Sequence, residues 1–424
     1  MIHYEIYKEK TKHLSIEIKD NQVEALDSAE EYGVAVRVIK DGRLGFAYSS
    51  KQDVAEKELV EMAAQIAEHV APDADLSLPE PQKISDMKQD VGFFSRLSIE
   101  EKKDIGKRVE SSAKNYDKRI KSVRKAAYDE YVRETEIKNS KGVDIAFSSG
   151  LCLARITAIA EENGHSEWSS EIDYSLNPKM LDPEETGKTA AKRAISYLGS
   201  KKISSRHVPC LLDREVVSEM LDFFVPAFFA DSVYKKKTPF LDGIGREIYS
   251  GNITLVDDAT LPGGYSTVVS DSEGVPSRKT VMVKKGRLNS FLADTLYAKK
   301  VGIENTASST RSQINMMPRI GIHNLYIEKG KASFKELIQE LNNGLYVTDV
   351  MGLHTANSVT GDFSVGVNGF LIENGDIVHG VKQVTMAGNF HKILNNVIKV
   401  GSDIKFLRHS GSPSLLIKEI VVSG

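Results

Sequence analysis

The first fifty residues alternate between hydrophobic and polar positions with the two-residue period of a half-buried β-strand. The period runs through HLSIEIK, QVEALDS, YGVAVRVIK and RLGFAYS, and Asp41-Gly42 between the last two is a typical hairpin dipeptide. A helix is predicted next, because Asp53 and Glu56 have capping-box spacing. Its expected apolar face comprises Ala55, Leu59, Met62, Ala63, Ile66 and Val70.

A second unit with the same mixture of patterns follows a polar, proline-containing linker, APDADLSLPEPQK. Ser98 and Glu101 form a capping box that predicts a helix to about Lys114. Strand-like runs continue to HSEWSSEIDYS, and Asp182-Pro183 then begins another helix, with Gly199 just past its end. We therefore predict two mixed α/β units, residues 1–85 and 86–205.

The remaining residues, 206–424, show a different pattern. One helix-like segment from about Arg214 to Val233 precedes many short strands that are separated by Gly and Asn turns. Ser333 and Glu336 cap one further short helix. The predicted fold class is α+β, with a large antiparallel β-rich C-terminal domain that forms a sheet or a partly closed barrel.

Composition and charge exclude several classes of protein. The formal net charge of −3 over 424 residues argues against a nucleic-acid-binding face. Charged residues interrupt every apolar stretch well before the ~18 residues of a membrane span, and the N-terminus lacks a secretory signal pattern. We expect a cytoplasmic protein, with Cys152 and Cys210 as buried thiols because both lie in apolar runs.

A search for catalytic motifs finds none that is intact. The sequence contains no HExxH zinc motif and no GxxxxGK[ST] phosphate loop, and its ten histidines are scattered. The run Gly361 to Gly366 is one residue too long for the GxSxG nucleophile motif. Asp257 and Asp258 end a predicted strand before a Pro-Gly turn, where carboxylates typically bind turn backbone. From the residues alone no active site is identified.

Three long motifs in the C-terminal half carry a resemblance to a known family. They are VDDATLPGGYSTVVSDSEGVPSR, FLADTLYAKKVG and GLHTANSVTGDFSVGVNGFLIENGDI, in that order. Together they resemble the TldD/PmbA family, and the last run is most similar to its PmbA (TldE) branch. The family's three-part layout also agrees with the predicted boundaries. Members of the branch are also labelled modulators of DNA gyrase.

The resemblance implies a division of labour between two subunits. The TldD-type subunit is a zinc metallopeptidase with HExxxH on a helix and a cysteine ligand near the C-terminus, and it pairs with a PmbA-type subunit that lacks them. The complex is implicated in cutting unfolded peptides, including a microcin precursor and an antitoxin. In this sequence the HExxxH positions fall on Leu221, Asp222 and Pro226, and no cysteine follows Cys210. Leucine and proline do not coordinate zinc.

The resemblance therefore predicts a non-zinc, non-catalytic subunit of a TldD/TldE-type metallopeptidase, with zinc expected in a TldD-like partner. Its expected ligand is an unfolded peptide, held by strand addition, with neither nucleic acid nor membrane as a partner. The run from Gly361 to Gly375 is the candidate peptide channel or interface, although a plain structural hairpin explains it equally well. Candidate site residues are His354, Gly361, Asp362, Ser364 and Glu373.

Two alternative functions remain open at this point. One is a homodimer with a binding or regulatory role and no protease partner. The other is a peptidase with a different site, built on Asp257, Asp258 or His354.

Overall fold

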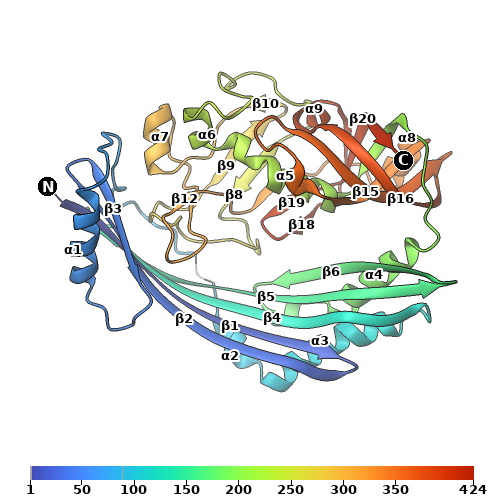
Figure 1. Cartoon of the computed structure of the whole chain (residues 1–424), viewed down its shortest axis with the longest axis horizontal. Helices are drawn as coiled ribbons and strands as arrows, with labels where there is room; N and C mark the ends of the chain where they lie inside the picture. The colour runs from blue at the N-terminus through green and yellow to red at the C-terminus, as the bar shows by residue number, and fades with distance from the viewer. Residues whose placement is uncertain (1, 88) are drawn as a thin grey trace.

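A curved sheet of six antiparallel strands lies beneath the C-terminal half of the chain, residues 206–424, in the computed structural model, which describes residues 2–87 and 89–424 (Figure 1). Its strand order is β3-β2-β1-β4-β5-β6, so strands from both predicted N-terminal units belong to one sheet. The strands are β1 (Ile2–Lys19), β2 (Gln22–Lys40), β3 (Arg43–Ser49), β4 (Ile120–Asn139), β5 (Asp144–Glu162) and β6 (His165–Ser175).

Local turn chemistry connects these strands as the sequence predicts. The β2–β3 hairpin turns at Asp41 and Gly42, whose φ angles of 51° and 69° are those of a tight hairpin, which confirms that prediction. The pairing of β1 with β4, by contrast, joins residues more than a hundred positions apart, such as Ser15 with Asp129.

The two faces of the sheet have different partners, because successive side chains of a strand point to opposite faces. Even-numbered residues of β1, β4 and β5, such as Ile16, Tyr128 and Ala154, pack against the helices on the outer face. Odd-numbered residues, such as Tyr7, Tyr131 and Phe147, line a cavity shared with the C-terminal half. The outer-face helices are α2 (Gly92–Arg96), α3 (Ile99–Lys114) and α4 (Pro183–Ser196).

Helix starts differ in how well the sequence identified them. The Ser98–Glu101 capping box of α3 and the Asp182 cap of α4 are confirmed. The capping box predicted at Asp53 and Glu56 is wrong: α1 (Glu56–Ala67) begins after Ala55, which makes no side-chain cap. Its buried face is Leu59, Ala63 and Ala67, whereas the expected Met62, Ile66 and Val70 are exposed. The packing of α1 on β2 and β3 selects a narrower stripe than the apolar pattern suggested.

A small barrel forms the centre of the C-terminal half. Five strands close it, because β16 pairs with β20 as well as with β15, and this confirms the predicted α+β class with a β-rich C-terminal half. Its strands are β7 (Arg206–Leu212), β14 (Gly344–Met351), β15 (Asp362–Glu373), β16 (Asp376–Asn389) and β20 (Leu415–Ser423), with β17 (Val397–Val400) added at β20. The helices beside it are α8 (Phe334–Leu341), whose Ser333–Glu336 capping box is confirmed, and α9 (Phe390–Asn395).

A second six-stranded sheet of short strands stands beside the barrel, in the order β10-β9-β8-β13-β19-β18. These strands are β8 (Leu255–Asp258), β9 (Lys279–Lys284), β10 (Arg287–Leu288), β13 (Leu325–Ile327), β18 (Lys405–Leu407) and β19 (Ser410–Ser412). The remaining pair is β11 (Ser309–Thr310) with β12 (Arg319–Ile320), and α7 (Thr295–Val301) follows β10. A single hydrophobic core joins the barrel to this sheet.

The segment from 214 to 233, expected as one helix, is interrupted. It forms α5 (Arg214–Phe224), a 3₁₀ turn (Val225–Phe228) and α6 (Ala230–Tyr234). Pro226 explains the break, because proline lacks the N–H that would continue the α-helical hydrogen bonds. Cys152 and Cys210 are buried free thiols, as predicted. Within the described residues no helix is both long and apolar enough to cross a membrane.

Candidate functional site

Three adjoining cavities lie where the C-terminal half faces the sheet or the linker beside it. The central cavity, about 550 Å³, is bounded mainly by odd-numbered residues of β1, β4 and β5 on one side and by residues 265–268, 270–272, 309–312 and 409 on the other. The helix-end cavity, about 760 Å³, is bounded by β2, the linker at 76–78 and the segment that follows α5. Both cavities are lined by Thr310, Arg319 and Ile322, so they meet at the β11–β12 turn.

The positions that the resemblance assigned to a zinc motif divide between two environments. Leu221 is 3% exposed and packs into the core of the C-terminal half. Asp222 and Pro226 instead line the helix-end cavity. The segment that would carry the motif therefore lies at the cleft, as we call the three adjoining cavities together. It presents a carboxylate and a proline ring to the helix-end cavity.

Asp222 contacts the C-terminal part of the chain. The Ser410 hydroxyl donates to Asp222 Oδ1 at 3.2 Å, so a residue of α5 meets a residue of β19 across 188 positions. The resemblance places the family's cysteine ligand near the C-terminus, and here a serine contacts Asp222, the residue that the resemblance assigns to the glutamate position. Beside it, His409 Nδ1 lies 2.7 Å from Ser266 Oγ, and burial lowers the pKa of His409 although the charge of Asp222 opposes this.

The residues at these positions do not fit a zinc ion. Zinc in proteins takes three or four Cys, His or carboxylate ligands, and Leu221 and Pro226 offer none. Within the described residues no group of three or more His, Cys, Asp or Glu is arranged to hold a metal ion. Asp222 is the one carboxylate of the three motif positions, and its Oδ1 already accepts from Ser410.

The candidates in the glycine-rich run lie on the barrel, away from the cavities. Asp362 and Glu373 are the two ends of β15, up to about 36 Å apart along the strand at ~3.3 Å per residue. Ser364 is exposed on the outer face of the barrel, and His354 is exposed on the 3₁₀ turn Leu353–Thr355. The structure thus does not gather these side chains into one site, and Gly361 is buried beside His391.

The alternative catalytic groups are also separated. Asp257 Oδ1 accepts from the backbone N–H of His323 at 2.9 Å, and His323 Nδ1 lies 3.5 Å from Asp257 Oδ2. Asp258 accepts from the Thr260 N–H at 2.9 Å, the turn-binding role that its position predicts. Among the described residues no hydrogen bond or ion pair joins either carboxylate to His354. Asp257 and Asp258 therefore each bind backbone N–H groups of their own surroundings.

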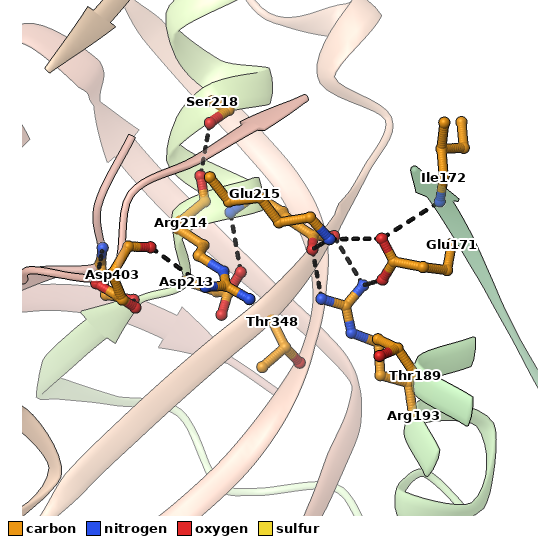
Figure 2. Close-up of polar contacts among 12 residues, drawn as sticks. Glu171, Ile172, Thr189, Arg193, Asp213, Arg214, Glu215, Ser218, Thr348 and Asp403 are labelled. Carbon is orange, nitrogen blue, oxygen red and sulfur yellow. Dashed lines mark hydrogen bonds and ion pairs between the residues drawn. The ribbon is translucent and has the colours of Figure 1, made fainter. Parts of the chain in front are cut away.

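An ion-pair cluster holds the C-terminal half to β6 of the sheet and to α4 (Figure 2). Figure 2 shows Arg193 on α4 pointing toward Glu215 on α5 and Glu171 on β6. Arg193 Nη1 donates to Glu215 Oε2 at 2.8 Å and lies 3.2 Å from Glu171 Oε2, while Lys405 Nζ donates to Glu215 Oε1 at 2.8 Å. Burial alone would raise the pKa of Glu215, but Arg193 and Lys405 lower it to about 2.

Acid is expected to weaken this contact between pH 4.5 and pH 2. A carboxylate whose folded pKa lies below its ordinary value of 4.5 stabilises the fold above that pH, and the stabilisation is lost as pH falls through the folded pKa. At pH 7 we expect Glu215→Gln to lower the free energy of unfolding by about 2–3 kcal/mol, and at pH 3 by clearly less. Urea unfolding of both proteins at the two pH values measures this.

The control for that experiment is Glu304→Gln. Glu304 also pairs with an arginine, Arg278, but its side chain is 83% exposed. Exposed ion pairs contribute roughly 0–1 kcal/mol, so this variant should differ little from the unaltered protein at either pH. Equal effects of the two substitutions at pH 7 would contradict the assigned role of Glu215.

Sequence reasoning missed several residues of the cleft. Arg311, Ser270 and Ser309 line the central cavity, and Ser410 contacts Asp222, yet none was singled out from the sequence, although Ser270 lies within the first of the three family motifs. The available signal was weak, because the serines lie in turns and very short strands where such residues are common. Only their arrangement in space brings them together.

Comparisons with known proteins extend over nearly the whole chain. Family models match in order: PmbA/TldA metallopeptidase domain 1 over residues 4–68, its central domain over 94–198 and its C-terminal domain over 205–424. The sequence is 29% identical over 428 residues to the metalloprotease PmbA of Escherichia coli O157:H7, an alignment that covers 99% of this chain and 92% of that protein.

Two solved structures share the fold along its full length. A proposed modulator of a DNA gyrase from Thermotoga maritima superposes with a TM-score of 0.92 at 29% identity, covering 100% of this chain and 96% of that one. TldE from Thermococcus kodakarensis superposes with a TM-score of 0.90 at 25% identity, covering 100% and 97%.

Proposed function

The chain belongs to the PmbA/TldA metallopeptidase family, and from this membership we propose that it is the non-zinc, non-catalytic subunit of a TldD/TldE-type metallopeptidase. In this role it completes a substrate chamber and an interface with a TldD-like, zinc-bearing partner in the cytoplasm. The substrates are unfolded peptides.

One observation carries the proposal: the helix segment at the cleft is present, but its metal-binding side chains are not. Asp222 and Pro226 line the helix-end cavity, Leu221 is turned into the core, and Ser410 occupies the contact to Asp222. A chain that kept the catalytic chemistry would need at least three ligands at this place. The cavities beside the segment are retained, which suits a subunit that binds peptide without cleaving it.

Peptide binding is supported by the cleft itself. The concave face of the sheet presents polar side chains such as Thr11, Tyr131 and Thr135, which can bind main-chain groups of an extended segment. Strand β6 pairs with β5 along one edge only, among the strands that the structure describes. An open edge of this kind can accept a further strand through backbone hydrogen bonds, independently of its sequence.

Co-purification with a TldD-like partner from the protein's own cell tests the proposal. We expect a heterodimer that contains zinc and cleaves an unfolded peptide, and an isolated chain that does neither. Elemental analysis and a peptidase assay on each species are the measurements. Stoichiometric zinc together with cleavage by the isolated chain would show that it is itself a peptidase. A stable homodimer with no TldD-like partner would favour the regulatory alternative.

A further inference from the structure

The lining of the central cavity carries more positive than negative charge. Arg133, Arg311 and Arg319 contribute to it, and among its described residues Asp271 is the one carboxylate. Both carboxylate oxygens of Asp271 already accept backbone N–H groups, those of Glu273, Val275 and Ser309, so the chain itself balances its charge. The wall thus presents net positive charge to an occupant, and this suits an anionic ligand.

Arg311 is the most buried of the three arginines, with 1% of its side chain exposed. Its Nη1 donates to the Met316 carbonyl, and its Cζ lies 4.4 Å from the centre of the Tyr7 ring. Its Nε and Nη2 make no hydrogen bond within the described residues. Glu5 Oε1 is 3.5 Å from Nη2, but it accepts its hydrogen bond from Arg37 Nε. Nε and Nη2 form the edge with which arginine binds both oxygens of a carboxylate.

Two serine hydroxyls in the same lining are likewise buried without a hydrogen-bond partner among the described residues. Ser270 is 2% exposed and Ser309 is 1% exposed, and the Oγ atoms of both lack a hydrogen-bond partner in the described part of the chain. Buried polar groups without partners are uncommon in folded proteins, because each has given up its bonds to water. Several such groups in one cavity wall indicate a ligand that supplies acceptor atoms.

A smaller and more apolar cavity, about 390 Å³, adjoins the central one. The two share part of their lining, including Phe147, Leu176 and Val268. Met87, Phe93, Pro262 and Val269 complete most of the apolar surface of the smaller cavity. A bulky apolar side chain fits such surroundings while the charged group next to it reaches the central cavity.

We propose that the central cavity binds the C-terminal carboxylate of a peptide, and that the last side chain of that peptide occupies the apolar cavity. The donors to the carboxylate are the Nε–Nη2 edge of Arg311 and the hydroxyls of Ser270 and Ser309. The inference rests on the proposed peptide-binding function and adds which end of the peptide is recognised. A carboxyl terminus matches the two adjoining cavities because its carboxylate and its last side chain are attached to the same Cα atom. The carboxylate can then lie in the central cavity while the side chain lies in the apolar one.

Binding of a labelled peptide to the purified full-length chain tests this inference. The probe is an unstructured pentapeptide ending in phenylalanine, fluorescein-labelled at its N-terminus, with a free carboxylate or a carboxamide. By fluorescence anisotropy we expect the carboxamide to bind about tenfold more weakly, because the charged hydrogen bonds are lost. A peptide ending in alanine should also bind more weakly than the phenylalanine peptide, since it leaves the apolar cavity empty.

Substitutions test whether the central cavity is the place where the free-acid peptide is distinguished from the carboxamide peptide. Arg311→Met should bind the free acid and the amide equally. Arg124→Met is the matched control: Arg124 is exposed on β4, lines none of the three cavities, and should keep the difference. Ser309→Ala removes an unpartnered hydroxyl, so it should fold normally and bind the free acid several-fold more weakly. If Arg311→Met does not fold, Ser309→Ala is the test: unchanged binding of the free acid by this variant contradicts the inference.

Each contrary result has a distinct meaning. Equal binding of acid and amide by the unaltered chain overturns the inference and leaves peptide binding in place. A carboxamide peptide with an internal aspartate that binds as tightly as the free acid shows that a side-chain carboxylate is recognised, which overturns recognition of the terminus. Failure of every peptide to bind removes the proposed peptide-binding function together with the inference.

Discussion

Arg37→Met is expected to cost about 3–5 kcal/mol of folding free energy, because it removes the cation that two buried carboxylates share and, among the described residues, leaves Glu5 only Arg311, 3.5 Å away. Arg37 Nε donates to Glu5 Oε1 at 3.0 Å, and Arg37 Nη1 donates to Glu273 Oε1 at 2.9 Å. The side chains of Glu5 and Glu273 are 1% and 4% exposed. Glu5 and Arg37 lie on β1 and β2, whereas Glu273 belongs to the C-terminal half, so the cluster also joins the two parts.

Urea unfolding at pH 7 measures this cost, with Arg124→Met as the exposed control. Adding Glu5→Gln and Glu273→Gln to Arg37→Met should recover part of the lost stability, because neutral amides are cheaper to bury than unpaired charges. A loss below about 1 kcal/mol would show that the carboxylates find other partners or reach solvent.

Arg37 also marks the limit of what hydrophobic alternation predicts. It lies in the run YGVAVRVIK, which the two-residue period correctly identifies as a strand, here part of β2. The same period implies that the polar positions face water. Arg37 instead faces Glu273, 236 positions later, because the C-terminal half covers that face of the sheet. A local pattern carries no information about a covering surface so distant in the chain.

Features that depend on a few neighbouring residues were predicted well. The capping boxes at Ser98 and Ser333 and the Asp41-Gly42 turn are local hydrogen-bonding or backbone preferences. The same kind of reasoning failed at Asp53, where the helix begins at Glu56 and its packing against the sheet decides the buried face. Closure of the barrel by β16 and β20 depends on strand pairing over long separations, which no turn signal encodes.

The candidate site shows the same contrast between what neighbouring residues determine and what distant packing determines. The family resemblance directed attention to Leu221, Asp222 and Pro226, and two of these three do line a cavity. The contact of Asp222 with Ser410 could not be read from the sequence, because it depends on how β19 packs beside α5. Arg311 was missed for a related reason: its significance lies in Nε and Nη2 atoms that are buried without a hydrogen bond in the part of the chain that the structure describes, which is a property of its surroundings.

Gly361→Ala is expected to lower the free energy of unfolding by about 3 kcal/mol, which would explain part of the glycine-rich run by structure alone. Gly361 has a φ of 87°, a conformation that costs an L side chain about 1–2 kcal/mol. An added Cβ would also lie 2.6 Å from Cδ2 of His391. His391 cannot easily retreat, since it is buried among Phe224, Phe240 and Tyr249.

Gly352→Ala separates these two causes. Gly352 has a φ of 83°, yet an added Cβ would meet no atom within 4 Å, so only the backbone strain should appear. Thermal and urea unfolding of the two variants should therefore differ by the steric contribution of the His391 ring, and His391→Ala should reduce the extra cost of Gly361→Ala. Equal losses would mean that the ring moves aside freely. If Gly361→Ala were stable but no longer bound a TldD-like partner, the run would be an interface, as the sequence first suggested.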